Sequence, residues 1–282
     1  MSRAVWLVIA GIVSVQLGAS FAKDLFGTIS PTALVWLRLA TSALILAAIA
    51  RPRLRGRSGR DWQVAVAFGL CLGLMNWAIY QSFSRIPLGI AVTLEFIGPL
   101  ALAVVGSRRA RDLVWVGLAL VGVALLGAER AELDLVGVLF ALVAGAAWAA
   151  YILLSASTGR RWPGFDGLAV ASVIAAVVLA PAAIVAGGTT LLEAHVLLIG
   201  TVIGVLSSVI PYSFELVALR TLRPSVFGIL MSLEPAAAAL AAAAVLGELL
   251  SAWQCLAIAC VVVASIGATR TGGPVHHEPA PD

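Results

Sequence analysis

Two glutamates beside prolines interrupt long apolar stretches of the sequence. Glu95 lies in TLEFIGPLALAVV, residues 93–105, four residues before Pro99, and Glu234 directly precedes Pro235. A proline has no backbone N–H and clashes with the carbonyl group four residues earlier, which for Pro99 is the carbonyl of Glu95 itself. Each acid–proline pair therefore predicts a helix kink with a carboxyl group beside it. Such a polar site suits an ammonium group or an exchangeable proton.

Long apolar segments make up most of the 282 residues. Hydrophobic residues amount to 61% and charged residues to 11%, whereas soluble domains carry roughly a quarter charged residues. A helix needs about 20 apolar residues to cross a bilayer. Ten segments approach that length, at residues 4–22, 31–50, 62–83, 88–106, 113–128, 134–156, 166–186, 194–219, 225–246 and 252–269. The sequence therefore predicts an all-α integral membrane protein with ten transmembrane helices, whose short loops leave no room for a soluble catalytic domain.

The basic residues gather in alternate loops. Basic residues near the ends of spans stay on the cytoplasmic side. With the amino terminus inside, 14 of the 18 basic residues lie on the inner side, three lie outside, and Arg38 lies within a span. We therefore expect a protein of the plasma membrane, the inner membrane of a bacterium, with both termini cytoplasmic. The basic loop at residues 51–61 is expected to contact anionic membrane lipid, and no basic face suited to nucleic acid is expected.

The two halves of the chain resemble each other. Residues 1–133 and 134–270 each contain five expected spans, and residues 271–282 form an expected disordered cytoplasmic tail. Matching landmarks recur at a nearly constant separation: Gly69 and Gly73 with Gly200 and Gly204, Pro31 with Pro163, Pro87 with Pro224, and Pro99 with Pro235. An odd number of spans in each half means that the second copy is inverted. Inverted repeats are typical of secondary transporters, whose substrate sites lie near the midplane between the repeats.

Four ionisable side chains lie within the expected spans: Arg38, Glu95, Glu215 and Glu234. Each costs about 2.5–3.5 kcal/mol at a helix centre and therefore needs a partner, water or a proton. Glu95 lies roughly 10 Å into its span at helical rise, near mid-depth. Arg38 either extends to the headgroups or forms a structural ion pair, or donates two hydrogen bonds to a carboxylate. Glu215, five residues before Arg220, is expected to reach the interface.

Uncharged polar and aromatic side chains complete the expected lining of the site. Gln16 interrupts the first span, Asn76 and Tyr80 share one face of the third, and Trp148 and Tyr151 share one face of the sixth. Residues four apart on a helix lie on the same side. The alternative for the aromatic residues is a position at the membrane interface, where Trp and Tyr are enriched. Tyr80 stands near the outer end of its span, so this alternative applies to it in particular.

Several stretches also resemble a known family. These are VTLEFIGPLA (92–101) after SRIPLGIA (84–91), LRPSVFGILMSLEPAAAALAAAAVLGE (222–248), and VWLRLATSAL (35–44) with Arg38. On these residues the chain resembles the EamA type of the drug/metabolite transporter superfamily, and most of all its threonine/homoserine exporter branch. The resemblance implies ten spans in two repeats, with a cavity between them lined by spans one, three, four, six, eight and nine.

The leading interpretation is a secondary transporter that exports small polar metabolites, with the substrates threonine and homoserine implied by the resemblance. Desolvation favours the protonated form of a carboxyl group, so Glu95 or Glu234 could carry a proton inward as substrate leaves. The expected partners are a small-molecule substrate, membrane lipid and protons. No cofactor or metal is expected, and no nucleotide-binding motif is present.

Three alternatives stay open. The substrate could be a hydrophobic amine or drug, with Glu95 as the counter-ion of its ammonium group. An intramembrane enzyme acting on lipid would need a nucleophile or metal cluster, but the three histidines, His195, His276 and His277, belong to no membrane-deep motif. A purely structural subunit would have no reason to keep acids buried in the membrane.

Overall fold

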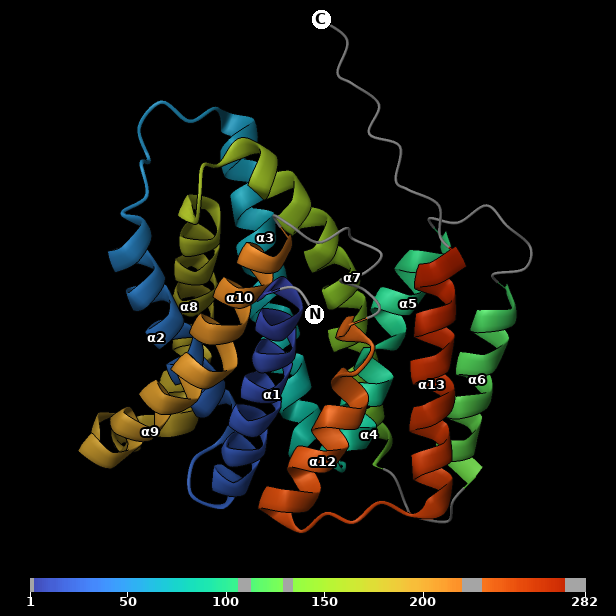
Figure 1. Ribbon diagram of the computed structural model, residues 1–282. Helices are drawn as coiled ribbons and strands as arrows, with labels where there is room; N and C mark the ends of the chain where they lie inside the picture. The colour runs from blue at the N-terminus through green and yellow to red at the C-terminus, as the bar shows by residue number, and fades with distance from the viewer. Residues whose placement is uncertain (1–2, 106–112, 129–133, 220–229, 272–282) are drawn as a thin grey trace, which may run out of the picture.

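The computed structural model describes residues 3–105, 113–128, 134–219 and 230–271, and these residues are helical apart from short connections (Figure 1). The helices are α1 (Arg3–Asp24), α2 (Pro31–Ala50), α3 (Gly59–Phe83), α4 (Leu88–Glu95), α5 (Ile97–Val105), α6 (Leu113–Ala128), α7 (Leu135–Arg161), α8 (Asp166–Gly187), α9 (Ala194–Gly204), α10 (Ile210–Leu219), α12 (Glu234–Leu246) and α13 (Ala252–Thr271). A π-helical turn, Val205–Val209, joins α9 to α10. The predicted all-α class is confirmed.

The lengths of the helices agree with a membrane-spanning chain. Six apolar stretches in the described residues are long enough to cross a bilayer, and four shorter apolar helices accompany them. Together they occupy the places of the ten expected segments. Two of those segments are interrupted: α4 and α5 are separated at Phe96, and α12 begins only at Glu234.

Local sequence signals explain where several helices begin and end. The Ser58 side chain accepts from the Asp61 N–H while the Asp61 side chain accepts from the Ser58 N–H, a capping box that starts α3. Asp134 caps α7 by accepting from the Val136 N–H at 2.8 Å. Gly247 ends α12 with φ 67°, a left-handed conformation that glycine adopts without steric cost.

Four helices, α2, α3, α7 and α8, pack closely together, and we call them the four-helix block. α3 packs along both α7 and α8, and α2 packs along α8. The Trp36 indole donates to the Ala176 carbonyl at 2.9 Å, and the Cys71 thiol donates to the Ala147 carbonyl at 3.0 Å. A Cβ at Gly69 of α3 would lie 2.8 Å from the Ala171 carbonyl oxygen of α8, so the glycine permits this approach.

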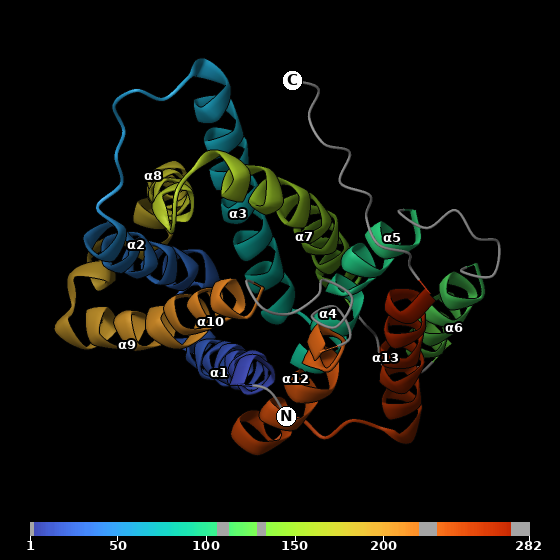
Figure 2. The ribbon, with the colours of Figure 1, turned by 45° about the horizontal axis from the view of Figure 1, so that its top comes forward.

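The remaining helices pack around this block. α1 contacts α10 and α12, the latter also contacts α4, and both α4 and α5 contact α7. The segment from α9 to α10 lies against α1 and α2. Helices α6 and α13 pair with each other at one side of the bundle (Figures 1 and 2).

Ion pairs mark the two ends of the bundle. At one end, which we call the basic end, Arg57 lies 3.7 Å from Asp166 and stacks 4.5 Å from the Trp162 ring centre, while Arg161 lies 3.2 Å from Asp61. This end carries the loop between α2 and α3 and the connection between α7 and α8 (Figure 1).

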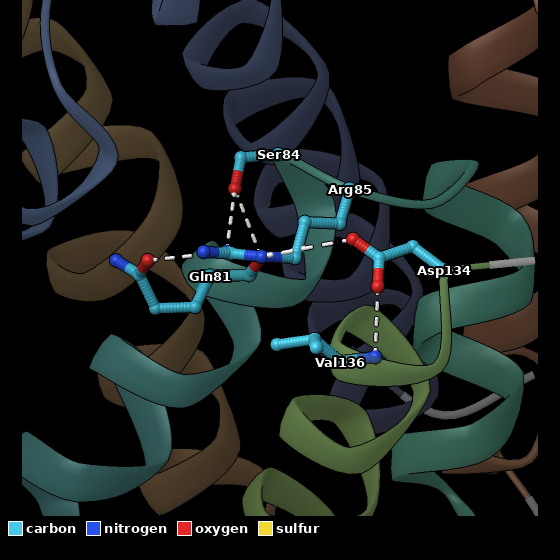
Figure 3. A network of polar contacts seen from close by, with 5 residues as sticks. All are labelled: Gln81, Ser84, Arg85, Asp134 and Val136. Atoms are coloured by element: carbon cyan, nitrogen blue, oxygen red, sulfur yellow. Dashed lines mark hydrogen bonds and ion pairs between the residues drawn. The ribbon is translucent and has the colours of Figure 1, made fainter.

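The opposite end, which we call the Lys23 end, holds the ion pair of Lys23 with Glu248 and the network around Arg85. Arg85 Nη1 donates to the Gln81 carbonyl at 2.6 Å and contacts the Ser84 hydroxyl, while its Nε lies 3.9 Å from Asp134 (Figure 3). The network joins the end of α3 to the beginning of α7.

Candidate functional site

Glu95 stands at the interruption between α4 and α5. The Phe96 N–H still reaches the Val92 carbonyl at 3.0 Å, but Pro99 has no N–H to donate to the Glu95 carbonyl. That carbonyl faces the backbone of α7, since a Cβ at Gly145 would lie 2.5 Å from its oxygen. The kink at Pro99 therefore brings α4 and α5 against α7. The Glu95 carboxyl group is the polar element that remains, and the residue is 9% exposed.

Glu234 occupies the matching interruption in the second half of the chain. It is the first residue of α12, is followed by Pro235, and is 7% exposed. The Leu233 N–H bonds to the Leu230 carbonyl at 3.0 Å, which forms a tight turn immediately before the helix. Because α12 packs against α4 and α1, the two interrupted segments and their acids lie on neighbouring elements. Glu234 interacts electrostatically with both Glu95 and Glu215.

Arg38 holds the π-helical turn between α9 and α10. Its Nε donates to the Ser208 hydroxyl at 2.8 Å and its Nη2 donates to the Ser207 carbonyl at 2.6 Å. The guanidinium lies 5.6 Å from the centre of the Tyr80 ring, and the residue is 5% exposed. The interpretation in which Arg38 extends to the headgroups is therefore wrong, and no ion pair of Arg38 is found among the residues that the structure describes.

Tyr212 and Glu215, both on α10, join the site although neither was among the expected lining residues. The Tyr212 ring lies 6.3 Å from Tyr151, and Tyr212 interacts electrostatically with Arg38 and Glu95. Glu215 interacts in the same way with Tyr151 and Tyr212. Glu215, which we expected to reach the interface, thus lies beside two tyrosines of the site. We call the set of Arg38, Glu95, Tyr151, Tyr212, Glu215 and Glu234 the acid–tyrosine cluster.

The other expected residues surround this cluster in different ways. Asn76 donates to the Leu72 carbonyl of its own helix at 2.8 Å, and its side chain also lies beside Tyr212. Trp148 makes an edge-to-face contact with Phe96 at 5.4 Å, directly beside Glu95.

Gln16 and Tyr80 are buried polar residues. Within the described part of the chain, Gln16 Oε1 has no hydrogen-bond partner, and Tyr80 lies against the Arg38 guanidinium. Tyr80 packs against Phe26 and Phe83 and is fully buried, so its alternative placement at the membrane interface is wrong. Leaving the buried Gln16 oxygen without a partner is costly.

Several residues of the acid–tyrosine cluster are partly exposed although they lie within the predicted spans. Tyr151, Tyr212 and Glu215 of the cluster and the neighbouring Trp148 are each partly exposed, whereas Tyr80 is fully buried. The partial exposure of the cluster therefore lies at its tyrosines and Glu215, whereas Arg38 and Glu95 are 5% and 9% exposed. Within the described ranges, no three His, Cys, Asp or Glu side chains lie close enough together to hold a metal ion.

Comparisons with known proteins place this arrangement in a family. The EamA-like transporter family matches residues 135–270. The threonine/homoserine exporter RhtA of Salmonella typhimurium strain SL1344 is 43% identical over 95% of this chain and 92% of its own length. The protein of the same name from Escherichia coli K12 is 41% identical over the same shares.

A solved structure, described as the crystal structure of a protein, shares the fold. It aligns with a TM-score of 0.67 over 96% of this chain and 98% of that chain, at 17% sequence identity. The sequence relatives assign the chain to a family, because they are 41–43% identical over 95% of it. The chain belongs to the EamA-like transporters of the drug/metabolite transporter superfamily, in the threonine/homoserine exporter branch, and is an integral membrane transporter of small molecules rather than an enzyme.

Proposed function

We propose that this protein exports threonine, homoserine and closely related amino acids by alternating access, with protons as the coupling ion. The observation that carries the proposal is the acid–tyrosine cluster, found in a chain 43% identical to a threonine/homoserine exporter. The cluster supplies what such a substrate requires: negative groups for its ammonium, a positive group for its carboxylate and phenols for its hydroxyl.

Two charges of opposite sign define the proposed binding mode. Glu95 receives the substrate ammonium group, and Arg38 attracts the substrate carboxylate from its position across the cluster. Arg38 and Glu95 interact electrostatically but form no ion pair in the described structure. The remaining lining comprises Gln16, Asn76, Tyr80, Trp148, Tyr151 and Glu234, to which Tyr212 and Glu215 are added.

Proton coupling follows from competition for the same carboxylates. Glu234 interacts electrostatically with both Glu95 and Glu215, and like charges held close together disfavour simultaneous ionisation. An ammonium group and a proton therefore compete for Glu95 and Glu234, and one leaves when the other binds. The protons released or taken up belong to the cluster as a whole rather than to one residue.

The proposed architecture is a pair of inverted five-helix repeats, residues 1–133 and 134–270. The helix contacts support it. In two such repeats, α3 corresponds to the segment from α9 to α10, α7 corresponds to α1, and α8 corresponds to α2. The contact of α3 with α7 thus has its counterpart in that of α10 with α1, and the contact of α3 with α8 has its counterpart in that of α9 with α2. The family match begins at residue 135, beside the proposed boundary. Residue 133 and residues 272–282 of the expected tail at 271–282 lie outside the described residues, and Thr271 belongs to α13.

The proposed orientation places the basic end in the cytoplasm. The described arginines at that end, including Arg51, Arg57, Arg160 and Arg161, support this assignment through the retention of basic residues on the inner side. Both termini then lie inside, and the Lys23 end faces outward.

Counterflow in proteoliposomes tests the function. Vesicles preloaded with unlabelled threonine or homoserine should accumulate the labelled compound through wild-type protein, saturably, and Glu95→Gln should abolish this uptake. The matched control is Glu193→Gln, which removes an acid whose side chain is 51% exposed at the Lys23 end. If wild-type protein exchanges neither compound, the substrate assignment is refuted. If Glu95→Gln keeps counterflow but loses its response to an imposed pH gradient, Glu95 couples protons and the ammonium group binds elsewhere.

A further inference from the structure

Lys23 and Glu248 form an ion pair that joins three separate segments of the chain. Lys23 Nζ lies 2.6 Å from Glu248 Oε1 and also donates to the Ile86 carbonyl at 2.7 Å. Glu248 Oε2 accepts from the Leu88 N–H at 2.9 Å. The two side chains are 16% and 23% exposed. Each charge therefore has a second partner, and the pair is largely shielded from water.

The three joined segments are those that carry the proposed site. Lys23 lies in the last turn of α1, the helix of Gln16, and Glu248 follows the C-terminal cap of α12, the helix that starts with Glu234. The Leu88 N–H belongs to the first turn of α4, which ends at Glu95. One ion pair thus ties the ends of α1, α4 and α12 together on a single side of the membrane, and a passage between these helices cannot open there while the pair is intact.

The neighbouring pair of Arg85 and Asp134 has a different place in the structure. It joins α3 to α7, both members of the four-helix block, and its side chains are 31% and 42% exposed at a separation of 3.9 Å (Figure 3). Arg85 also lies 5.1 Å from the centre of the Phe140 ring of α7. This network lies within the four-helix block, whereas the pair of Lys23 and Glu248 joins α1, α4 and α12, which lie outside it.

We infer that Lys23 and Glu248 are the gate of this transporter at the Lys23 end, and that their ion pair breaks each time the site opens to that side. The inference rests on the proposed function for its transport cycle. It adds two residues that do not touch the substrate but decide when the site is accessible.

Lys23 is the only lysine of the chain, which permits a selective covalent lock. A water-soluble carbodiimide condenses the Lys23 amine with the Glu248 carboxylate to an amide and takes up the water as a urea. Peptide mass spectrometry measures the cross-linked fraction. Lys23→Arg is the matched control, because it keeps the charge and every carboxylate but its guanidinium does not form the amide.

The expected result is that threonine counterflow falls in proportion to the cross-linked fraction and that carbodiimide-treated Lys23→Arg keeps its rate. Equal losses in both proteins would overturn the gate, because they would trace to other carboxylates. Continued exchange by fully cross-linked protein would also overturn it while leaving the transport function intact. Failure of untreated wild-type protein to exchange threonine would instead count against the proposed function.

A second readout does not depend on the substrate. In a background with Cys71, Cys255 and Cys260 changed to serine, Tyr151→Cys places a thiol in the acid–tyrosine cluster. A membrane-impermeant thiol reagent added from the Lys23 side should react about fivefold faster when Glu248→Gln is added, the shift given by a loss of roughly 1 kcal/mol. Adding Glu193→Gln instead should not change the rate. Equal rates in the two variants would refute the gate even if the amino acid assignment were wrong.

Discussion

Replacing Gly145 with alanine tests whether the crossing of α7 with the interruption at Glu95 positions the site. The new Cβ would lie 2.5 Å from the Glu95 carbonyl oxygen, 3.2 Å from its carbonyl carbon and 3.3 Å from its Cα. All three are backbone atoms, so no side chain can rotate away. A comfortable C···O contact is about 3.3–3.6 Å, which means that the helices must separate by roughly 1 Å.

The size of the effect follows from two opposing terms. Forcing a methyl group into a packed contact costs about 1–3 kcal/mol. Replacing glycine by alanine within a helix gains about 0.5–1 kcal/mol. The net destabilisation is therefore on the order of 1–2 kcal/mol. The displacement acts directly on Glu95, and a misplacement of about 1 Å in a reacting group can lower a rate on the order of a hundredfold.

The assay compares Gly145→Ala with Gly159→Ala, which lies in the same helix and whose added Cβ would meet no atom of the described structure within 4 Å. Melting in detergent should occur at a lower temperature than wild type for Gly145→Ala and at an equal or higher temperature for Gly159→Ala. Threonine counterflow should fall sharply only in the former. If the two variants behave alike in both measurements, the close contact at Gly145 does not position Glu95.

Three further predictions concern other contacts. Arg38→Lys keeps the charge but cannot make both bonds to the turn of α9 and α10, so it should lose about 1.5–3 kcal/mol of stability and slow counterflow, measured on the same preparations. Tyr212→Phe keeps the ring that faces Tyr151 but removes the hydroxyl, so it should raise KM for threonine with little change in melting temperature; an unchanged KM would exclude the hydroxyl from the site. Arg57→Gln removes a cation–π contact with Trp162 worth about 0.5–1 kcal/mol together with the ion pair to Asp166, so melting should shift downward while counterflow is unaffected.

Much of the architecture could be predicted from hydropathy because a bilayer demands long apolar helices. The expected spans at 31–50 and 113–128 coincide with α2 and α6. The interruption beside Glu95 was also predictable, since Pro99 removes a backbone donor. The close contact of Gly145 with the Glu95 carbonyl could not be predicted, because it depends on how closely two helices that are distant in sequence approach each other.

The site was predicted less completely than the fold, and the π-helical turn explains part of the difference. Val205–Val209 forms this wider turn directly before α10, and an added residue per turn rotates the following side chains relative to ideal helical spacing. Tyr212 and Glu215 consequently point toward the cluster, where periodicity did not place them. The partners of Arg38 could not be predicted either, because Ser207 and Ser208 lie 169 and 170 residues away in the sequence.

The many contacts within the four-helix block should make its helices open less often than the other helices of the protein. Amide hydrogens exchange with deuterium only when their hydrogen bonds open, and segments with many tertiary contacts open least often. Thr32 alone accepts from both Trp77 and Gln81, so α2 and α3 are held at several levels. Exchange should be slowest in α2, α3, α7 and α8 and faster in α1, α4 and α12. On this view the four-helix block is the more rigid part of the protein, and the proposed site lies where the more mobile helices pack against it.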